Sequence, residues 1–373
     1  MSRSYQRLFL LLSGLLLSLP ILVHISGVVP ASNVSEREKR TLAQLPRFPR
    51  SIPEWRRLPI YVDRYLQDHF GLRSIMAAID AEWHYALRSS RDFRVFINSS
   101  GRLFWRADHM LEQSAGSIRR DSEVAETVKF LVRLRDNLSK RGIRFFIAPP
   151  PNGSTIYQDQ LPDWARGQGR TTEYDLLLSQ LALSGITGID LRPALLSARE
   201  SGETYFRYDT HWNTRGALAA FNATVQAAGH RDWRLDPSVA LGPTQPRDAG
   251  DLAAFIGMAG RLIEPVDTHD FTARKTTLSN PASSPSDGAV PPAFLLESNV
   301  AGPTIMVIGD SFTGGSFVAF LVRRAHRVIW QHHRWCNFDW TWIEQFRPDE
   351  VWWMPTERYL NCSPQPNRRV LPD

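Results

Sequence analysis

The stretch Pro303-Thr-Ile-Met-Val-Ile-Gly-Asp-Ser-Phe312 decides the fold. Its apolar and β-branched residues, Thr304 to Ile308, predict a buried strand that ends at Gly309. Ser311 follows at the start of a second apolar run, Phe312 to Val322, which predicts a helix. Free helix N–H groups and the helix dipole favour negative charge at such a turn. Ser311 is therefore either an exposed nucleophile with an oxyanion site beside it or an ordinary helix cap.

Strands and helices alternate on both sides of this stretch. The predicted strands are 143–148, 187–191, 304–308, 326–330 and 350–354, and amphipathic helices separate them. This rhythm predicts an α/β fold with a parallel sheet flanked by helices. Ligands of such sheets bind beyond the carboxyl ends of the strands, so we expect the loop after residue 148 to lie beside Ser311.

One elaborated domain fits the length of 373 residues, and we place it at residues 59–365. Helices are predicted within residues 61–88 and a hairpin over residues 93–105. A proline- and arginine-rich linker is expected at 31–58, and residues 277–292, rich in Ser, Pro, Ala and Gly, predict an irregular excursion. The net charge of +6 comes mostly from arginine, but no basic run is interleaved with aromatic residues, which gives nucleic-acid binding little support.

The N-terminus carries a long apolar run from Leu8 to Val29 that follows Arg3 and Arg7. Such a segment is either a signal peptide, with Val29-Pro-Ala31 as the cleavage site, or an uncleaved signal anchor. Because the run is longer than a usual signal core, we expect residues 1–30 to contain a transmembrane anchor that crosses the inner membrane through residues 8–29. Both alternatives place the folded part outside the cytoplasm, in a bacterial periplasm.

Cys336 and Cys362 are the only cysteines in the chain. In an oxidising compartment a lone pair is often a disulfide, and both residues lie near predicted element ends. We expect these two residues to pair, with two free thiols as the alternative.

The stretch Tyr208-Asp-Thr-His-Trp-Asn213 supplies the partners that a serine nucleophile needs. Asp209 and His211 are two positions apart, so their side chains leave the same face of an extended segment. Asp209 could then hold one ring nitrogen of His211 while the other nitrogen takes the serine proton. Trp212 could exclude water from the site, and Asn213 is placed to cap the following helix.

This stretch and Gly309-Asp-Ser-Phe312 together resemble the SGNH-hydrolase-like domain of the AlgJ/AlgX-type alginate O-acetyltransferases. Supporting matches in the same order include Gln67-Asp-His-Phe-Gly-Leu-Arg73, Pro151-Asn-Gly-Ser-Thr-Ile-Tyr157 and Gly250-Asp-Leu252. Asp209 and His211 precede Ser311 here, which is the permuted order of that family.

The resemblance implies an acetyl-enzyme on Ser311, with His211 as general base and Asp209 orienting it. It also implies a hydroxyl of an exported polysaccharide, alginate or a similar exopolysaccharide, as acceptor and a multi-pass membrane acyltransferase as acetyl donor. Two features depart from the family pattern: Gly153 stands where we expect a lysine, and the chain has no room for a C-terminal carbohydrate-binding domain.

Further residues are candidates for contact with the substrate. Asn152 and Tyr157 could face the acceptor or contribute to the oxyanion site, or could instead be an ordinary turn asparagine and a packed loop tyrosine. Arg207 and Arg358 could bind a uronate carboxylate, although structural ion pairs are the commoner use of arginine. Asp310 is expected to cap the helix. The tryptophans of the C-terminal part could stack on sugar rings, and at least half of them are expected in the core: Trp330, Trp335, Trp340, Trp342, Trp352 and Trp353.

The sequence thus predicts an anchored O-acetyltransferase with a Ser-His-Asp triad that needs no cofactor or metal. Two alternatives remain. A carbohydrate acetylesterase would use the same three residues, with water in place of the sugar hydroxyl. A non-catalytic polysaccharide-binding scaffold would keep the fold alone.

Overall fold

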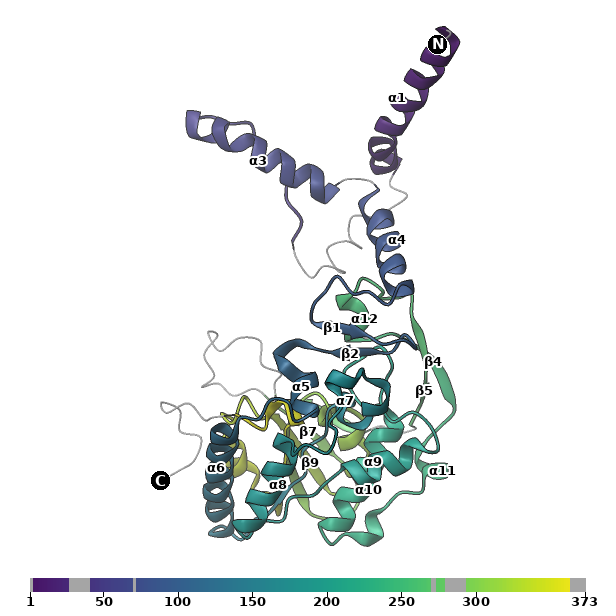
Figure 1. Cartoon of the computed structure of the whole chain (residues 1–373). Coiled ribbons are helices and arrows are strands. Elements are labelled where there is room, and N and C mark those ends of the chain that lie inside the picture. Colours follow the sequence, from purple (N-terminus) through teal and green to yellow (C-terminus); the bar gives the residue numbers. More distant parts are fainter. Residues whose placement is uncertain (1–2, 27–40, 70–71, 270–272, 279–292, 363–373) are drawn as a thin grey trace.

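A six-stranded sheet forms the centre of the computed structural model, which describes residues 3–26, 41–69, 72–269, 273–278 and 293–362 (Figure 1). The strand order is β3-β10-β8-β9-β7-β6, so β10, the last strand of the sequence, lies between β3 and β8. The strands are β3 (Arg144–Ile147), β6 (Arg274–Thr277), β7 (Phe294–Glu297), β8 (Thr304–Gly309), β9 (Arg327–His332) and β10 (Glu350–Met354).

The sheet is mixed, which corrects the prediction of a parallel sheet. Strands β3, β10, β8 and β9 are parallel, whereas β7 runs antiparallel to β9 and β6 antiparallel to β7. Only residues 298–303 connect β7 to β8, and a parallel crossover needs a dozen or more residues, so this connection can only reverse the chain. The segment 187–191, predicted as a strand, makes a single bridge between Ile147 and Gly188.

Helices cover both faces of the sheet, as the sequence predicts. Along β8, Ile305 and Val307 pack into one core with α10 (Thr214–Ala227), whereas Met306 and Ile308 pack into the opposite core. This alternation follows from the two-residue period of a strand, and both faces are apolar because both are covered. The covering helices are α6 (Asp121–Ser139) and α8 (Glu173–Leu183) on one face, and α9 (Arg192–Arg199), α10 and α13 (Val318–Leu321) on the other.

A smaller layer packs above the sheet and carries the predicted hairpin (Figure 1). Strands β1 (Val95–Ile97) and β2 (Leu103–Trp105) pair antiparallel, and α12 (Asp251–Phe255) packs against them in a third apolar cluster. A second antiparallel pair, β4 (Thr244–Asp248) and β5 (Ile263–Asp267), was not predicted. The shorter remaining helices are α5 (Met110–Ser114), α7 (Gly153–Ile156), α11 (Pro237–Ala240) and α14 (Thr341–Phe346).

Of the three N-terminal helices that the structure describes, the first two lie away from this body, and the third packs against it with Ala81 in the third apolar cluster (Figure 1). They are α1 (Arg3–Ser26), α3 (Ile52–His69) and α4 (Arg73–Ala86), and α3 begins inside the segment predicted as a linker. No helix within the described residues is long and apolar enough to cross a membrane, so the predicted anchor is not confirmed. The predicted cleavage site and residues 279–292 of the predicted excursion lie outside the described residues.

Candidate active site

The turn after β8 holds Ser311 at the carboxyl edge of the sheet, with its side chain exposed. The carboxylate of Asp310 fixes this turn because it accepts the N–H of Phe312 at 3.0 Å and the N–H of Thr356 at 2.8 Å. Asp310 therefore holds the turn, but it does not cap a helix as expected: the helical turn that follows has Phe312 at its N-cap and no side-chain cap hydrogen bond.

The helix expected after Ser311 is irregular. Thr313–Phe317 forms a π-helical turn with non-helical backbone at Gly315, and α13 begins only at Val318. The N–H groups of Thr313 and Gly314 both donate to the carbonyl of Asp310, at 3.1 and 3.2 Å. These two donors are therefore not free for an oxyanion, contrary to the expectation from a regular helix start.

Ser311, His211 and Asp209 form one hydrogen-bonded chain. The Nε2 atom of His211 lies 2.7 Å from Ser311 Oγ, and its Nδ1 atom lies 2.6 Å from Asp209 Oδ1. The N–H of His211 also donates to the same Asp209 oxygen at 3.1 Å. The geometry is that of a nucleophile, a base and an orienting acid, in which the acid fixes the ring tautomer.

Arg247 of β4 completes the surroundings of Asp209. Its Nη2 atom donates to Asp209 Oδ2 at 2.8 Å, so both carboxylate oxygens have a partner. Burial of Asp209 alone would raise its pKa, but the hydrogen bond and charge of His211, together with Arg247, lower the pKa well below the usual range. These contacts therefore favour the ionised form of Asp209.

Gly250 allows the loop before α12 to approach this carboxylate. A Cβ atom at Gly250 would lie 1.8 Å from Asp209 Oδ2, so no other residue fits without displacing one of the two segments. The sequence comparison places Gly250 in a supporting motif but gives it no role, and Arg247 was missed altogether.

Asp251 braces the loop between Asp209 and His211. Its carboxylate accepts the N–H of Thr210 at 2.8 Å and the hydroxyl of Thr210 at 2.6 Å. Burial, with the nearby charge of Asp209, raises the pKa of Asp251. Ligand atoms of Asp209, His211 and Asp251 lie within 4.8 Å of one another, the one such group in the described residues, so they are the candidates for holding a metal ion. These atoms already bind Arg247, Thr210 and Ser311, which fits a proton-transfer site better than a metal site.

Trp212 hydrogen-bonds to the backbone of the turn that carries Ser311. It is buried, its Nε1–H donates to the carbonyl of Phe312 at 2.8 Å, and its ring stacks on Phe317. The structure therefore assigns Trp212 a positioning contact with the turn in place of the water-excluding wall suggested from sequence.

The loop after β3 lies behind the site and is separated from the serine turn by residues that follow β10. Asn152 is fully buried, and its backbone N–H donates to Glu357 Oε2 at 2.7 Å. Tyr157 is also buried; its hydroxyl accepts the N–H of Thr204 at 3.0 Å. The structure thus packs both residues inside the protein.

The two arginines proposed to bind a uronate differ in their surroundings. Arg207 pairs with Glu203 at 3.3 Å and donates to the carbonyl of Ser100 at 3.1 Å, which is a structural use. The Arg358 guanidinium lies 5.2 Å from the ring centre of Phe312, next to Ser311 in the sequence, and has no ion pair within the described residues. Of the two, only Arg358 stays close to the serine and unengaged.

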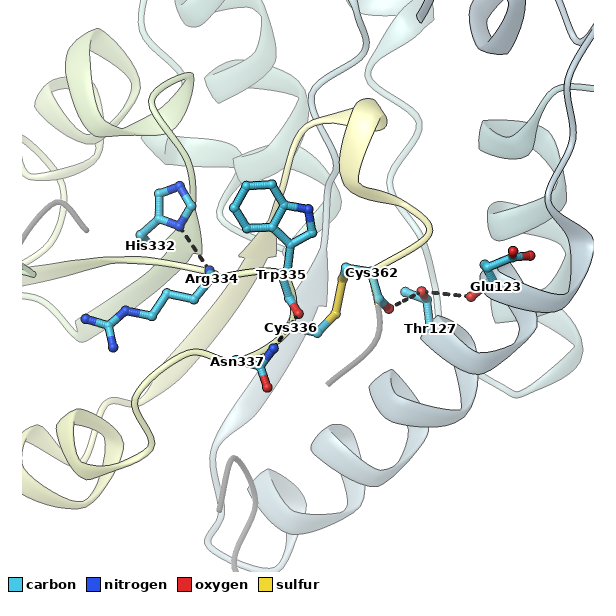
Figure 2. The surroundings of a disulfide bond; sticks show 8 residues. All are labelled: Glu123, Thr127, His332, Arg334, Trp335, Cys336, Asn337 and Cys362. Carbon is cyan, nitrogen blue, oxygen red and sulfur yellow. Dashed lines mark hydrogen bonds between the residues drawn. A yellow bond between two sulfur atoms is a disulfide. The ribbon is translucent and has the colours of Figure 1, made fainter. Parts of the chain in front are cut away.

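Cys336 and Cys362 are joined in a disulfide with their Cα atoms 5.7 Å apart (Figure 2). The carbonyl of Cys362 accepts the Thr127 hydroxyl of α6 at 2.8 Å. The disulfide thus ties the segment after β9 to the end of the described chain, at the same edge of the sheet as Ser311.

A model of the family described as "SGNH hydrolase-like domain, acetyltransferase AlgX" matches residues 101–353, which is more than half of the chain. The chain belongs to this family. The matched range of this AlgX-family chain includes Asp209, His211 and Ser311.

Relatives of this AlgX-family chain agree with that assignment. It is 24% identical over 196 residues to the "Probable alginate O-acetylase AlgJ" of Pseudomonas syringae pv. tomato, covering 51% of this chain and 47% of the relative. A second relative with that description, from Pseudomonas putida, is 23% identical over 199 residues, covering 51% of each. The chain therefore matches about half the length of these curated relatives.

One solved structure shares the fold, and another resembles it less closely. The structure of Bacillus cereus PatB1 with a sulfonyl adduct aligns with a TM-score of 0.52 at 14% identity, covering 71% of this chain and 94% of that one. The O-acetyltransferase domain of Pseudomonas putida AlgJ aligns with a TM-score of 0.48 at 19% identity, covering 73% and 94%.

Proposed function

We propose that this chain is an O-acetyltransferase that carries an acetyl group on Ser311 and passes it to a hydroxyl of an exported polysaccharide. The observation that carries the proposal is the hydrogen-bonded chain from Ser311 through His211 to Asp209. Membership of an acetyltransferase family and curated relatives described as probable alginate O-acetylases support the same reaction.

The reaction uses these residues twice. Ser311 Oγ attacks the acetyl carbonyl while His211 Nε2 takes its proton, and His211 returns that proton to the leaving oxygen of the donor. A sugar hydroxyl then gives its proton to His211 and attacks the acetyl-enzyme, and Ser311 recovers a proton as it leaves. Asp209, kept ionised by its surroundings, orients His211 and stabilises its charged form in both steps.

Export of the folded part belongs to the same proposal. The Cys336–Cys362 disulfide favours an oxidising compartment, which agrees with a periplasmic location. We propose an N-terminal attachment to the inner membrane and a multi-pass membrane acyltransferase as acetyl donor, as the family resemblance implies.

The test is mass spectrometry of the full chain after exposure to a small acetyl ester. We expect an acetyl adduct on Ser311 that is absent from Ser311→Ala and His211→Ala, while the exposed-serine control Ser99→Ala is labelled normally. An equal adduct in Ser311→Ala contradicts the proposal. Adding oligosaccharide separates the two reactions: acetylated oligosaccharide indicates transfer, and free acetate alone indicates the esterase alternative.

A further inference from the structure

Trp335 stands apart from the other tryptophans of the C-terminal part. Five of the six are buried, whereas Trp335 is 58% exposed. It lies three residues beyond β9, at the edge where β9 pairs with β8: Gly309 opposes His332, and the N–H of His333 donates to the Gly309 carbonyl at 2.8 Å. An exposed indole therefore lies at the same sheet edge as Ser311.

The backbone holds this indole outward in an unusual conformation. Arg334, Trp335 and Cys336 have φ values of 50°, 52° and 63°, three consecutive left-handed residues without a glycine. Each such residue costs of order 1 kcal/mol, and runs of them persist only where the surroundings enforce them.

Two hydrogen bonds and the disulfide hold the turn (Figure 2). The N–H of Arg334 donates to the His332 ring at 3.0 Å, the Asn337 amide donates to the Trp335 carbonyl at 2.9 Å, and Cys336 is covalently bound to Cys362. Strained backbone of this kind clusters at ligand clamps and active sites, so the turn points to a binding function for the side chain that it exposes.

Tyr359 links the indole to the candidate active site. Its ring meets the Trp335 ring edge-on with centroids 5.2 Å apart, and it packs on the buried ring of His333 at 4.7 Å. Tyr359 belongs to the 3₁₀ turn Glu357–Tyr359 after β10, next to Arg358. Tyr359 thus contacts Trp335, and the preceding residue, Arg358, lies over the ring of Phe312, the neighbour of Ser311.

Arg358 places an unpaired positive charge beside Phe312. Among the described residues it makes no ion pair, and its Nε is buried without a hydrogen-bond partner. A guanidinium without an ion pair, next in the chain to a tyrosine that packs on an exposed indole, matches a sugar that carries a carboxylate. Arginine binds carboxylates through two donors, and a ring face covers the apolar face of a sugar.

We propose that Trp335, Tyr359 and Arg358 form an acceptor subsite for an acidic sugar unit, which positions a neighbouring unit of the same polymer for attack on the acetylated Ser311. The inference deepens the proposed function and rests on it. Trp335 supplies the stacking surface, Arg358 pairs with the carboxylate, and the disulfide keeps the turn in place.

The test measures binding without turnover. In the full-length Ser311→Ala background, calorimetry compares an alginate oligosaccharide with a neutral cello-oligosaccharide of equal length. We expect the acidic oligosaccharide to bind more tightly, and Trp335→Ala and Arg358→Gln each to weaken that binding about tenfold or more, as truncation of aromatic and arginine anchors does at binding hot spots. Trp335→Phe should retain part of the affinity. The matched control is Trp83→Ala on α4, also an exposed tryptophan, which should bind like the parent.

Equal binding of both oligosaccharides, no binding of either, or unchanged affinity in Trp335→Ala and Arg358→Gln would each overturn the subsite. Circular dichroism melts confirm that the variants are folded, and Trp335→Phe and Arg358→Gln test the inference where Trp335→Ala does not fold. Acetylation of Ser311 by a small ester is measured separately in the parent chain, so failure of the subsite and failure of the proposed function give different results.

Discussion

The contacts of Asp209 show which parts of a site can be predicted from residue spacing and which cannot. The two-residue interval between Asp209 and His211 predicts that their side chains meet, and the structure brings them together at 2.6 Å. Arg247 and Gly250 could not be predicted in the same way, because their contacts with Asp209 depend on how the β4–β5 pair and α12 fold back over the loop. Local spacing records contacts within one segment and carries little information on contacts between segments.

At this scale we predict that Asp209→Asn lowers turnover of an acetyl ester about 10⁴-fold, the loss expected when an orienting carboxylate becomes an amide that stabilises the wrong tautomer. Steady-state hydrolysis of the ester measures it. Asp248→Asn, an exposed carboxylate on the same hairpin as Arg247, is the matched control and should keep full turnover. Similar rates for the two variants would contradict an orienting role for Asp209.

Among the elements, strands were easier to predict than the turns that carry the site. The apolar run of β8 and the helices on both faces of the sheet agree with the sequence pattern. The helix after Ser311 was predicted as regular, but Gly314 and Gly315 weaken it and allow a π-helical turn there. The left-handed turn at 334–336 was not predicted, because it contains no glycine to indicate positive φ values.

Gly250→Ala tests whether the backbone that precedes α12 must lie this close to the carboxylate of Asp209. The new Cβ atom has no room beside Asp209 Oδ2, so the carboxylate must shift away from His211. We expect turnover to fall about 100-fold, the usual effect of a displacement near 1 Å in a catalytic group. Ester kinetics and a thermal melt are measured together. Loss of the cooperative unfolding transition would mean that the substitution disrupts the fold and not only the site. Full activity would show that the loop can accommodate the added Cβ atom without moving Asp209.

Removing the disulfide tests how much the Cys336–Cys362 bond stabilises the folded protein. Cys336→Ser with Cys362→Ser opens a loop of 26 residues, which should lower the free energy of unfolding by about 3 kcal/mol through the larger entropy of the unfolded chain. Urea unfolding of the double variant against the oxidised parent measures the difference. A change below about 1 kcal/mol would contradict a stabilising role for the disulfide.

For the whole molecule, the alternation of strands and helices predicts the α/β class, and the paired motifs predict the family that the chain proves to belong to. The two antiparallel strands β6 and β7 were not predicted, and periodicity would not have given their orientation. Here the short 298–303 connection carries that information. The buried polar layer behind the site was also not predictable, because its members come from distant parts of the chain: Gln113, Asn152, Glu173 and Glu357.

This layer predicts how the stability of the whole protein depends on pH. Complete burial raises the pKa of Glu357 from 4.5 to about 7, although Thr155 and Asn152 donate to its carboxylate. The folded state then binds a proton that the unfolded state releases, so the contribution of Glu357 to stability is full below about pH 4.5 and falls by about 3 kcal/mol as the pH rises to 7.

Glu357→Gln keeps the acceptor oxygen and cannot ionise. Across the same pH range it should therefore gain about 3 kcal/mol relative to the parent in urea unfolding experiments, whereas Glu200→Gln, at an exposed position, should follow the parent. A constant difference between Glu357→Gln and the parent at every pH would show that Glu357 does not titrate in this range.

The central place of β10 has a consequence for how the chain reaches its native state. Because this strand is made after every other strand of the described sheet and separates β3 from β8, the two halves of the sheet cannot join until residues 350–354 have been synthesised. Nascent chains that stop short of Glu350 should leave unpaired strand edges on both sides of a gap, a condition that favours aggregation.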